Sequence, residues 1–169
     1  MGKVLSDFKR GWPGAVSRSK DDVILSLKNG DQNAIAFGAP VFLKASSGSV
    51  VNFSSGTTTA DQFVGFAVRV PDKTPDAYPS ALGAGVDSDR GKFNTGDPVD
   101  VLARGSLVAS IATTSAKIGD KVYIRLSDGK LVTTAGDSGT TLELPNVRIR
   151  GSRDSGGCCE VVVTKRNLV

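Results

Sequence analysis

The segment Gly96-Asp97-Pro98-Val99-Asp100-Val101 shows a pattern that the chain uses three times. A glycine opens a turn, one residue follows, and a proline or lysine then precedes a β-branched residue that begins an alternating run. The pattern recurs at 38–43, where the proline is Pro40, and at 119–124, where Lys121 takes its place. Proline is tolerated as the first residue of a strand because its missing N–H need not join the ladder. The pattern therefore predicts short strands with sharp starts.

Similar alternating runs fill most of the chain, and turn residues separate them. The predicted strands are 23–28, 41–45, 50–54, 63–70, 99–103, 106–111, 121–126, 130–134, 144–150 and 158–165. Gly65 indicates a bulge inside one of these strands, and Gly105 indicates a turn between two others. About ten short strands and no convincing helix predict an all-β protein, built as a compact β-barrel or β-sandwich.

Two longer stretches of the chain resemble each other, which leaves two explanations open. Residues 38–51 and 96–108 both read Gly-x-Pro-Val, then a strand, a turn, Gly-Ser and an apolar pair. Either an old duplication of a two-stranded unit produced this likeness, or hairpins converged on the same sequence. Three or more copies would be expected of an open repeat array, so such an array is not indicated.

The ends of the chain differ in character from its middle. Residues 1–20 carry a net charge of +4, residues 21–147 carry −3 and residues 148–169 carry +3. We expect residues 1–20 to be a flexible, extended basic arm and residues 21–169 to be a single β domain. Three prolines and three glycines over 71–95 predict a long surface loop. A nucleic-acid-binding protein would more often carry its basic charge as a folded patch with stacking aromatic residues.

Trp12 is the only tryptophan of the protein, and it lies in the predicted arm. Pro13 follows it and favours an extended conformation at Trp12. The indole has two plausible roles. It caps the core of its own domain, or it anchors the arm on another subunit, since tryptophan and arginine are favoured interface anchors.

The composition argues against most enzyme classes. The 169 residues include no histidine, so Ser-His-Asp and Cys-His catalytic arrangements are excluded. The two cysteines, Cys158 and Cys159, are adjacent and too few for a zinc site. No phosphate-binding glycine loop occurs, and no segment reaches the roughly 20 apolar residues that span a bilayer. We expect no enzyme activity, no cofactor, no metal, no small-molecule substrate and no membrane partner, although a carboxylate-only enzyme stays formally open.

An ordered set of motifs resembles a known family. The motifs are Ala36-Phe37-Gly38-Ala39-Pro40-Val41, Phe63-Val64-Gly65-Phe66-Ala67-Val68, Gly96-Asp97-Pro98-Val99-Asp100-Val101-Leu102, Ile118-Gly119-Asp120-Lys121-Val122-Tyr123-Ile124 and Asp128-Gly129-Lys130-Leu131-Val132-Thr133. With a basic segment before them and a basic strand after them, they are similar to the capsid cement, or decoration, proteins of tailed bacteriophages. The resemblance covers residues 30–135. The paired cysteines and the 71–95 loop depart from it.

The resemblance implies a structural virion protein, made in the cytoplasm of the bacterial host. It would bind the outer surface of an icosahedral capsid and stabilise the joints between major capsid subunits. The implied partners are the major capsid protein and further copies of the chain, as a trimer or alternatively a dimer, with no specific nucleic acid. Rigid β domains with adhesive, extended ends suit such a role.

The predicted partner-binding residues are the aromatic and basic side chains of the two ends. They are Phe8, Lys9, Arg10, Trp12, Arg18, Lys20, Arg148, Arg150, Lys165 and Arg166. Two other functions remain open from the residues alone. One is a phage tail or baseplate β-module, which would have the same composition, and the other is a nucleic-acid-binding β-barrel that uses the basic ends as phosphate contacts.

Overall fold

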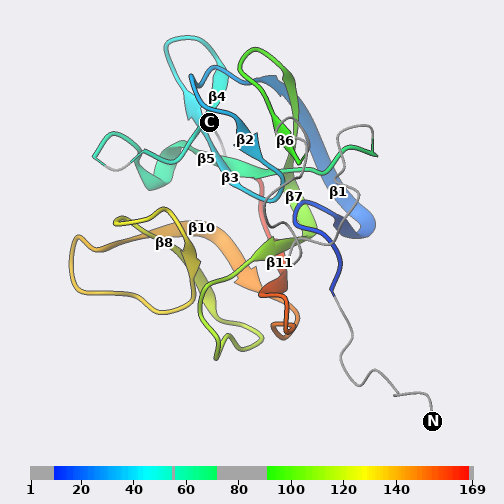
Figure 1. Cartoon of the computed structure of the whole chain (residues 1–169), viewed down its shortest axis with the longest axis vertical. Helices are drawn as coiled ribbons and strands as arrows, with labels where there is room; N and C mark the ends of the chain where they lie inside the picture. Colours follow the sequence, from blue (N-terminus) through cyan, green and yellow to red (C-terminus); the bar gives the residue numbers. More distant parts are fainter. Residues whose placement is uncertain (1–9, 55, 72–90, 168–169) are drawn as a thin grey trace, which may run out of the picture.

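The chain folds into a curled sheet of short strands (Figure 1), in a computed structural model that describes residues 10–54, 56–71 and 91–167. The elements are β1 (Val16–Lys28), β2 (Ile35–Ala36), β3 (Pro40–Lys44), β4 (Ser49–Asn52), the 3-10 turn η1 (Ala60–Gln62), β5 (Phe63–Ala67), β6 (Lys92–Phe93), β7 (Pro98–Ser110), β8 (Lys121–Arg125), β9 (Leu131–Val132), β10 (Thr141–Ile149) and β11 (Cys158–Val163). The predicted all-β class is confirmed.

The long strand β7 organises the sheet. The strand order is β4-β3-β5-β7-β11-β10-β8-β9, and β1 also pairs with β7. On β7, residues 101–102 pair with β5 and residues 105–110 pair with β11, all antiparallel. The two halves of β7 therefore belong to two parts of the sheet, which Figure 1 shows as an upper lobe around β3 to β5 and a lower lobe around β8, β10 and β11.

The first lobe closes on itself through the segment that follows β1. Asn29 forms a bridge with Val50 of β4, and the Gly30 N–H donates to the Val50 carbonyl at 2.9 Å. Asn29 also donates its backbone N–H to the Asp97 carbonyl at 2.8 Å, which ties the end of β1 to the start of β7. Strands β1, β7, β5, β3 and β4 thus form a nearly closed ring, and the short pair β2–β6 lies beside it.

The second lobe closes in the same way at the other end of β7. Strands β11, β10, β8 and β9 follow β7 in order. The Ala112 N–H, just after β7, donates to the Leu131 carbonyl of β9 at 2.8 Å, and the Thr133 N–H donates to the Thr113 hydroxyl at 3.0 Å. The last strand of the sheet therefore returns to the chain that leaves β7.

Two apolar cores fill the lobes, and β5 lies between them. All five residues of β5 are buried. Phe63 and Phe66 pack into the larger core with residues of β7 to β11, whereas Val64 and Ala67 pack into the smaller core with β1 to β4. The predicted bulge at Gly65 is confirmed by a register shift, and a Cβ there would lie 2.1 Å from the Leu102 carbonyl oxygen.

The glycine-led strand starts are confirmed at all three positions. Strands β3, β7 and β8 begin two residues after Gly38, Gly96 and Gly119, each of which has a positive φ. The two stretches that resemble each other nevertheless fold differently. Residues 38–51 form the β3–β4 hairpin, whereas residues 98–108 lie in the single strand β7. The sequence likeness of the two stretches therefore does not correspond to a shared two-stranded unit.

The prediction of a turn at Gly105 is wrong. Residues 99–103 and 106–111 were expected as separate strands, but β7 runs through Gly105 without interruption to Ser110. Gly105 has φ +125° because β1 bulges opposite it: Arg18 faces Ser106 and Val23 faces Arg104, so residues 19–22 oppose this one glycine. A Cβ at Gly105 would lie 2.0 Å from Asp22 Oδ1, so glycine leaves room for the bulge.

The predicted arm and loop lie partly outside the described residues. Of the expected arm, residues 16–20 form the beginning of β1, so the boundary expected after residue 20 falls inside a strand. Residues 10–15 also contact their own chain: the Gly14 N–H donates to the Val108 carbonyl at 2.7 Å, and the Val108 N–H donates to the Ala15 carbonyl at 2.9 Å. Residues 1–9 and 72–90 are not described, and the second of these ranges contains most of the expected 71–95 loop.

Candidate functional site

A row of basic side chains crosses the outer face of the second lobe. Register places Arg18 of β1 opposite Ser106 of β7, Ser106 opposite Val162 of β11, Val162 opposite Arg148 of β10, and Arg148 opposite Lys121 of β8. We call these five residues the basic row. It spans five strands, so its ends are roughly 19 Å apart at about 4.8 Å per strand.

The alternation of each strand directs the basic row away from the core. The sequence neighbours Leu107, Val161 and Val147 are buried in the larger core. Side chains of adjacent strand residues point to opposite faces, so Ser106, Val162 and Arg148 lie on the outer face. The side chains of Arg18 and Lys121 are 59% and 44% exposed. The row thus places three cations at the surface, with Val162 between them.

A buried carboxylate fixes the first cation of the row. Arg18 Nε donates to Glu160 Oε1 at 2.8 Å, and the Ser17 hydroxyl donates to the same oxygen at 3.0 Å. Burial opposes ionisation of Glu160, but the hydrogen bonds from Arg18 and Ser17 and the charges of Arg18 and Arg150 outweigh it. They hold the pKa of this carboxyl below its usual range. Glu160 therefore stays charged and keeps Arg18 in one orientation.

A second buried carboxylate holds the chain just before β1. Asp154 lies in the loop between β10 and β11 and is buried. Its Oδ2 accepts the Arg10 backbone N–H at 2.8 Å, and its Oδ1 accepts the Cys158 N–H at 2.8 Å. The Arg10 guanidinium donates to the Ser152 carbonyl at 3.0 Å and to the Ser152 hydroxyl at 2.7 Å. These contacts fix the position of Arg10, the first residue that the structure describes.

A groove of about 600 Å³ lies beside the basic row, over the bulge of β1. Four cations line it, which are Arg18, Lys20, Arg104 and Arg150. Arg150 Nη1 donates to the Ser106 hydroxyl at 3.4 Å, and Arg104 lies 3.6 Å from Asp21. Asp22 also lines the groove, and the pKa of its carboxyl is raised. Burial is the main cause and the charge of Asp21 adds to it, whereas a hydrogen bond from the Ser106 backbone acts in the opposite direction.

The structure brings together four of the ten predicted partner-binding residues. Arg18, Arg148 and Arg150 lie on one outer face, and Lys20 lies at the rim of the neighbouring groove. Arg10 contacts the loop at 152–154 of its own chain. Lys165 and Arg166 follow β11 and are exposed, whereas Phe8 and Lys9 lie outside the described residues.

Trp12 contacts its own chain, whichever further role it has. It is half-buried, and the Arg69 guanidinium lies 5.3 Å from the centroid of its ring. Its carbonyl accepts the Ala15 N–H at 3.0 Å. A cation over an aromatic face is attracted by the ring quadrupole, so Arg69 and Trp12 stabilise the turn that leads into β1.

Sequence reasoning missed Arg104, Lys121 and Glu160. Glu160 alternates with the apolar residues of its strand, which is the signal for an outward position. That position is nonetheless buried, because Arg18 and Ser17 cover it from β1. The same alternation could have placed Arg104 and Lys121 on strands. It could not place them near Arg18 and Arg148, because that depends on which strands pair with one another.

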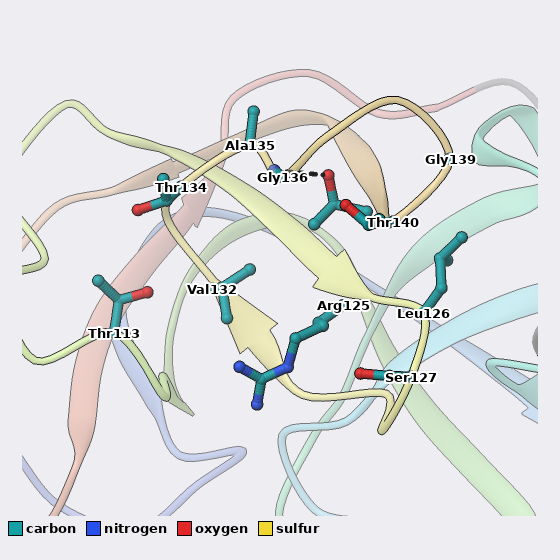
Figure 2. A pocket seen from close by; sticks show the side chains of 11 residues that line it. Thr113, Arg125, Leu126, Ser127, Val132, Thr134, Ala135, Gly136, Gly139 and Thr140 are labelled. Carbon is teal, nitrogen blue, oxygen red and sulfur yellow. Dashed lines mark hydrogen bonds between the residues drawn. The ribbon is translucent and has the colours of Figure 1, made fainter.

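A separate hollow of about 680 Å³ lies between β8, β9 and the loop at 133–140 (Figure 2). Hydroxyl groups and small residues dominate its lining, with Thr113, Ser127 and Thr140 among them. The only charged lining residue is Arg125, whose Nε donates to Asp128 Oδ1 at 2.9 Å. That hydrogen bond is the main reason why the pKa of Asp128 falls to about 2. The lining therefore offers hydrogen bonds but no general base.

Two further features bear on chemistry. Within residues 10–54, 56–71 and 91–167, no three acidic or cysteine side chains gather where they could hold a metal ion. In the same part of the chain, no helix is long and apolar enough to cross a membrane.

The comparisons with known proteins indicate a structural protein. Among the solved structures that match the chain is one titled "The capsid of Myoviridae Phage XM1". The match has a TM-score of 0.66 and 19% sequence identity, and it covers 98% of this chain and 96% of that one. This likeness establishes a shared fold. None of the curated proteins compared with the chain matches it.

A family comparison, in contrast, defines the class of the chain as that of phage structural proteins. Residues 3–164 match the family described as structural cement protein (E217 gp24/Pam3 gp6), which is nearly the whole chain. The chain therefore belongs to the phage structural cement protein family. Membership makes it a structural, capsid-associated protein of a bacteriophage.

Proposed function

We propose that this protein binds the outer surface of the icosahedral capsid and stabilises the joints between major capsid subunits. The observation that carries the proposal is the basic row, together with family membership. Five strands hold three cations in order on one face, where Arg18 is paired with Glu160, Lys121 is paired with Glu143, and Arg148 makes no ion pair with the described residues. A rigid, positively charged face suits a negatively charged partner surface, because prearranged side chains lose little entropy on binding.

The ends of the chain add to this attachment. Arg10, which follows residues 1–9 in the sequence, is fixed by Ser152 and Asp154. Phe8, Lys9, Arg10, Trp12, Lys20, Lys165 and Arg166 are proposed to contact a coat subunit or a sister copy of this chain. Self-association as a trimer, or as a dimer, would repeat these contacts, and weak contacts repeated on a shell add through multivalency. The protein would be made in the host cytoplasm and carried on the exterior of the virion.

The proposal is tested by adding the purified protein to shells that lack it. Decorated shells should resist heat or guanidinium to a higher level than bare shells, and electron microscopy should show added density on the outer surface. A variant that lacks residues 1–9 should decorate more weakly. Equal resistance of bare and treated shells would contradict the proposal.

A nucleic-acid role is weaker, because no aromatic residue lines the groove beside the basic row. Retention of duplex DNA at physiological salt, with an affinity comparable to that for shells, would favour it over attachment to a capsid. Sizing of the free protein by analytical ultracentrifugation separates the trimer from the dimer.

A further inference from the structure

We propose that Ile118 is the apolar anchor of the attachment surface and enters an acid-rimmed apolar depression on the shell subunit. This inference rests on the proposed function and adds the contact that positions the protein. Ile118 is 70% exposed. In the described part of the chain, the only other large apolar side chain with comparable exposure is Ile24 of β1, at 47%.

The turn that carries Ile118 is held rigidly. The Asp120 N–H donates to the Lys117 carbonyl at 3.1 Å, which closes a β-turn over Ile118 and Gly119. The Asp120 carboxylate accepts the Lys117 N–H at 2.8 Å. Gly119 has φ +93°, as a type II turn requires at its third position. Ile118 therefore occupies the second position of the turn, where proline is common.

The turn is also fastened to β10, beside the basic row. The Gly119 N–H donates to the Ile149 carbonyl at 2.8 Å, and the Ile149 N–H donates to the Asp120 carbonyl at 2.9 Å. Arg148 Nη1 donates to the Gly119 carbonyl at 3.2 Å. Arg148 is a member of the basic row, so the exposed isoleucine stands at the edge of that row.

Single exposed aliphatic side chains are common on protein surfaces and by themselves indicate nothing. Three observations distinguish Ile118: its large exposure, the hydrogen bonds that fix its turn from both sides, and the cations around it. A rigid apolar side chain loses little entropy when it enters a pocket. The structure thus presents a prearranged anchor.

The charges around Ile118 define the chemistry of the partner. Lys117 and Arg148 are both exposed and make no ion pair within the described residues, whereas Lys121 is neutralised by Glu143 at 2.7 Å. The Asp120 carboxylate is engaged with the turn backbone. The two unpaired cations favour carboxylates around the apolar depression that receives Ile118.

The test compares two exposed isoleucines in the full-length protein. Ile118→Ser should weaken sedimentation with purified shells by about 10- to 100-fold, since burying one aliphatic side chain contributes about 1.5–3 kcal/mol. The matched control, Ile24→Ser, should bind within about twofold of the original protein. Both variants should keep the original melting temperature within a few degrees, because both side chains are exposed.

The remaining outcomes each decide the matter. Shell binding by Ile118→Ser equal to that of the original protein would overturn this inference and leave the proposed function intact. Loss of binding in both serine variants would also overturn it. Failure of the original protein to bind shells would remove the proposed function itself. Ile118-dependent sedimentation with phosphatidylserine vesicles would identify a membrane contact and so overturn the inference.

Discussion

The Arg18 guanidinium lies 2.8 Å from the Glu160 carboxylate, although 142 residues separate them in sequence. Arg18 is at the start of β1 and Glu160 is near the end of the chain, in β11. The pair therefore fastens the two basic ends of the protein to each other through the second lobe. Arg18 is 59% exposed and Glu160 is 7% exposed, so solvent screens only one of the two partners.

Replacing Arg18 by glutamine should lower the free energy of unfolding by more than an exposed control substitution does, because the buried Glu160 carboxylate would lose its cationic partner. Urea unfolding measures the difference. The control is Lys20→Gln, an exposed cation two residues away, which should change stability by less than about 0.5 kcal/mol. Equal effects at both positions would show that the Glu160 contact contributes nothing.

The contribution of Glu160 should depend on pH in a defined direction. Its pKa is lower in the folded protein than its usual value of 4.5, so its ionisation stabilises the fold. That contribution is complete above pH 4.5 and is lost as the pH falls below this value. Glu160→Gln should therefore flatten the loss of melting temperature in the acid range. A parallel acid profile for the variant would contradict this prediction.

Asp22→Asn should stabilise the protein at pH 7. Asp22 Oδ1 is buried and accepts no hydrogen bond from the described residues, and burial raises the pKa of the carboxyl. The gain should be at most about 1 kcal/mol, since Asp22 is only partly buried and solvent screens its charge. The advantage should shrink as the pH falls through the raised pKa, because the original carboxyl then takes up a proton. Thermal melts at pH 7 and pH 4 test both points.

Gly105→Ala should destabilise the protein more than Gly96→Ala does. Both glycines have positive φ, which costs a non-glycine residue about 1–2 kcal/mol. A Cβ at Gly96 meets nothing within 4 Å, whereas at Gly105 it would lie 2.0 Å from Asp22 Oδ1. The more extreme φ of Gly105, +125° against +85° at Gly96, and the contact with the bulge of β1 both favour the larger loss at Gly105. Equal losses of unfolding free energy would show that the bulge adjusts freely.

The thiols should be unreactive in the native protein. Cys158 and Cys159 are both buried, and burial raises the pKa of the Cys159 thiol to about 11. The thiolate is the reacting species, so labelling with Ellman's reagent at pH 8 should require unfolding. Rapid labelling of one thiol without denaturant would show that β11 opens locally.

Local features of the fold could be predicted from sequence, because they depend on a few neighbouring residues. The strand starts after Gly38, Gly96 and Gly119 follow from backbone conformation and from the missing N–H of proline. The bulge at Gly65 belongs to the same kind of feature. The predicted turn at Gly105 is wrong because the conformation of this glycine depends on the contact with Asp22. Asp22 is distant in sequence and comes close only when β1 pairs with β7.

In the candidate site too, residue types could be predicted from sequence, whereas contacts between distant residues could not. Composition identified Arg18, Arg148 and Arg150 as basic residues of the two ends, but their alignment on one face depends on the order of five strands. Glu160 and Asp154, which fix Arg18 and Arg10, could not be assigned because the contacts join opposite ends of the chain. The sequence places Ile118 next to the turn residue Gly119. Its exposure could not be predicted, because it depends on the hydrogen bonds between this turn and β10.

Because β7 is one unbroken strand through both lobes, it leaves no flexible linker between them along residues 98–110 at which the lobes could swing apart. A force applied at the Ile118 turn passes through β10 and β11 into β7, and from there into β1 and β5. Several strand pairings then share the load. The two lobes should therefore move as one rigid body. Under mechanical load, we expect the pairing of the strands at the edges of the sheet to break first.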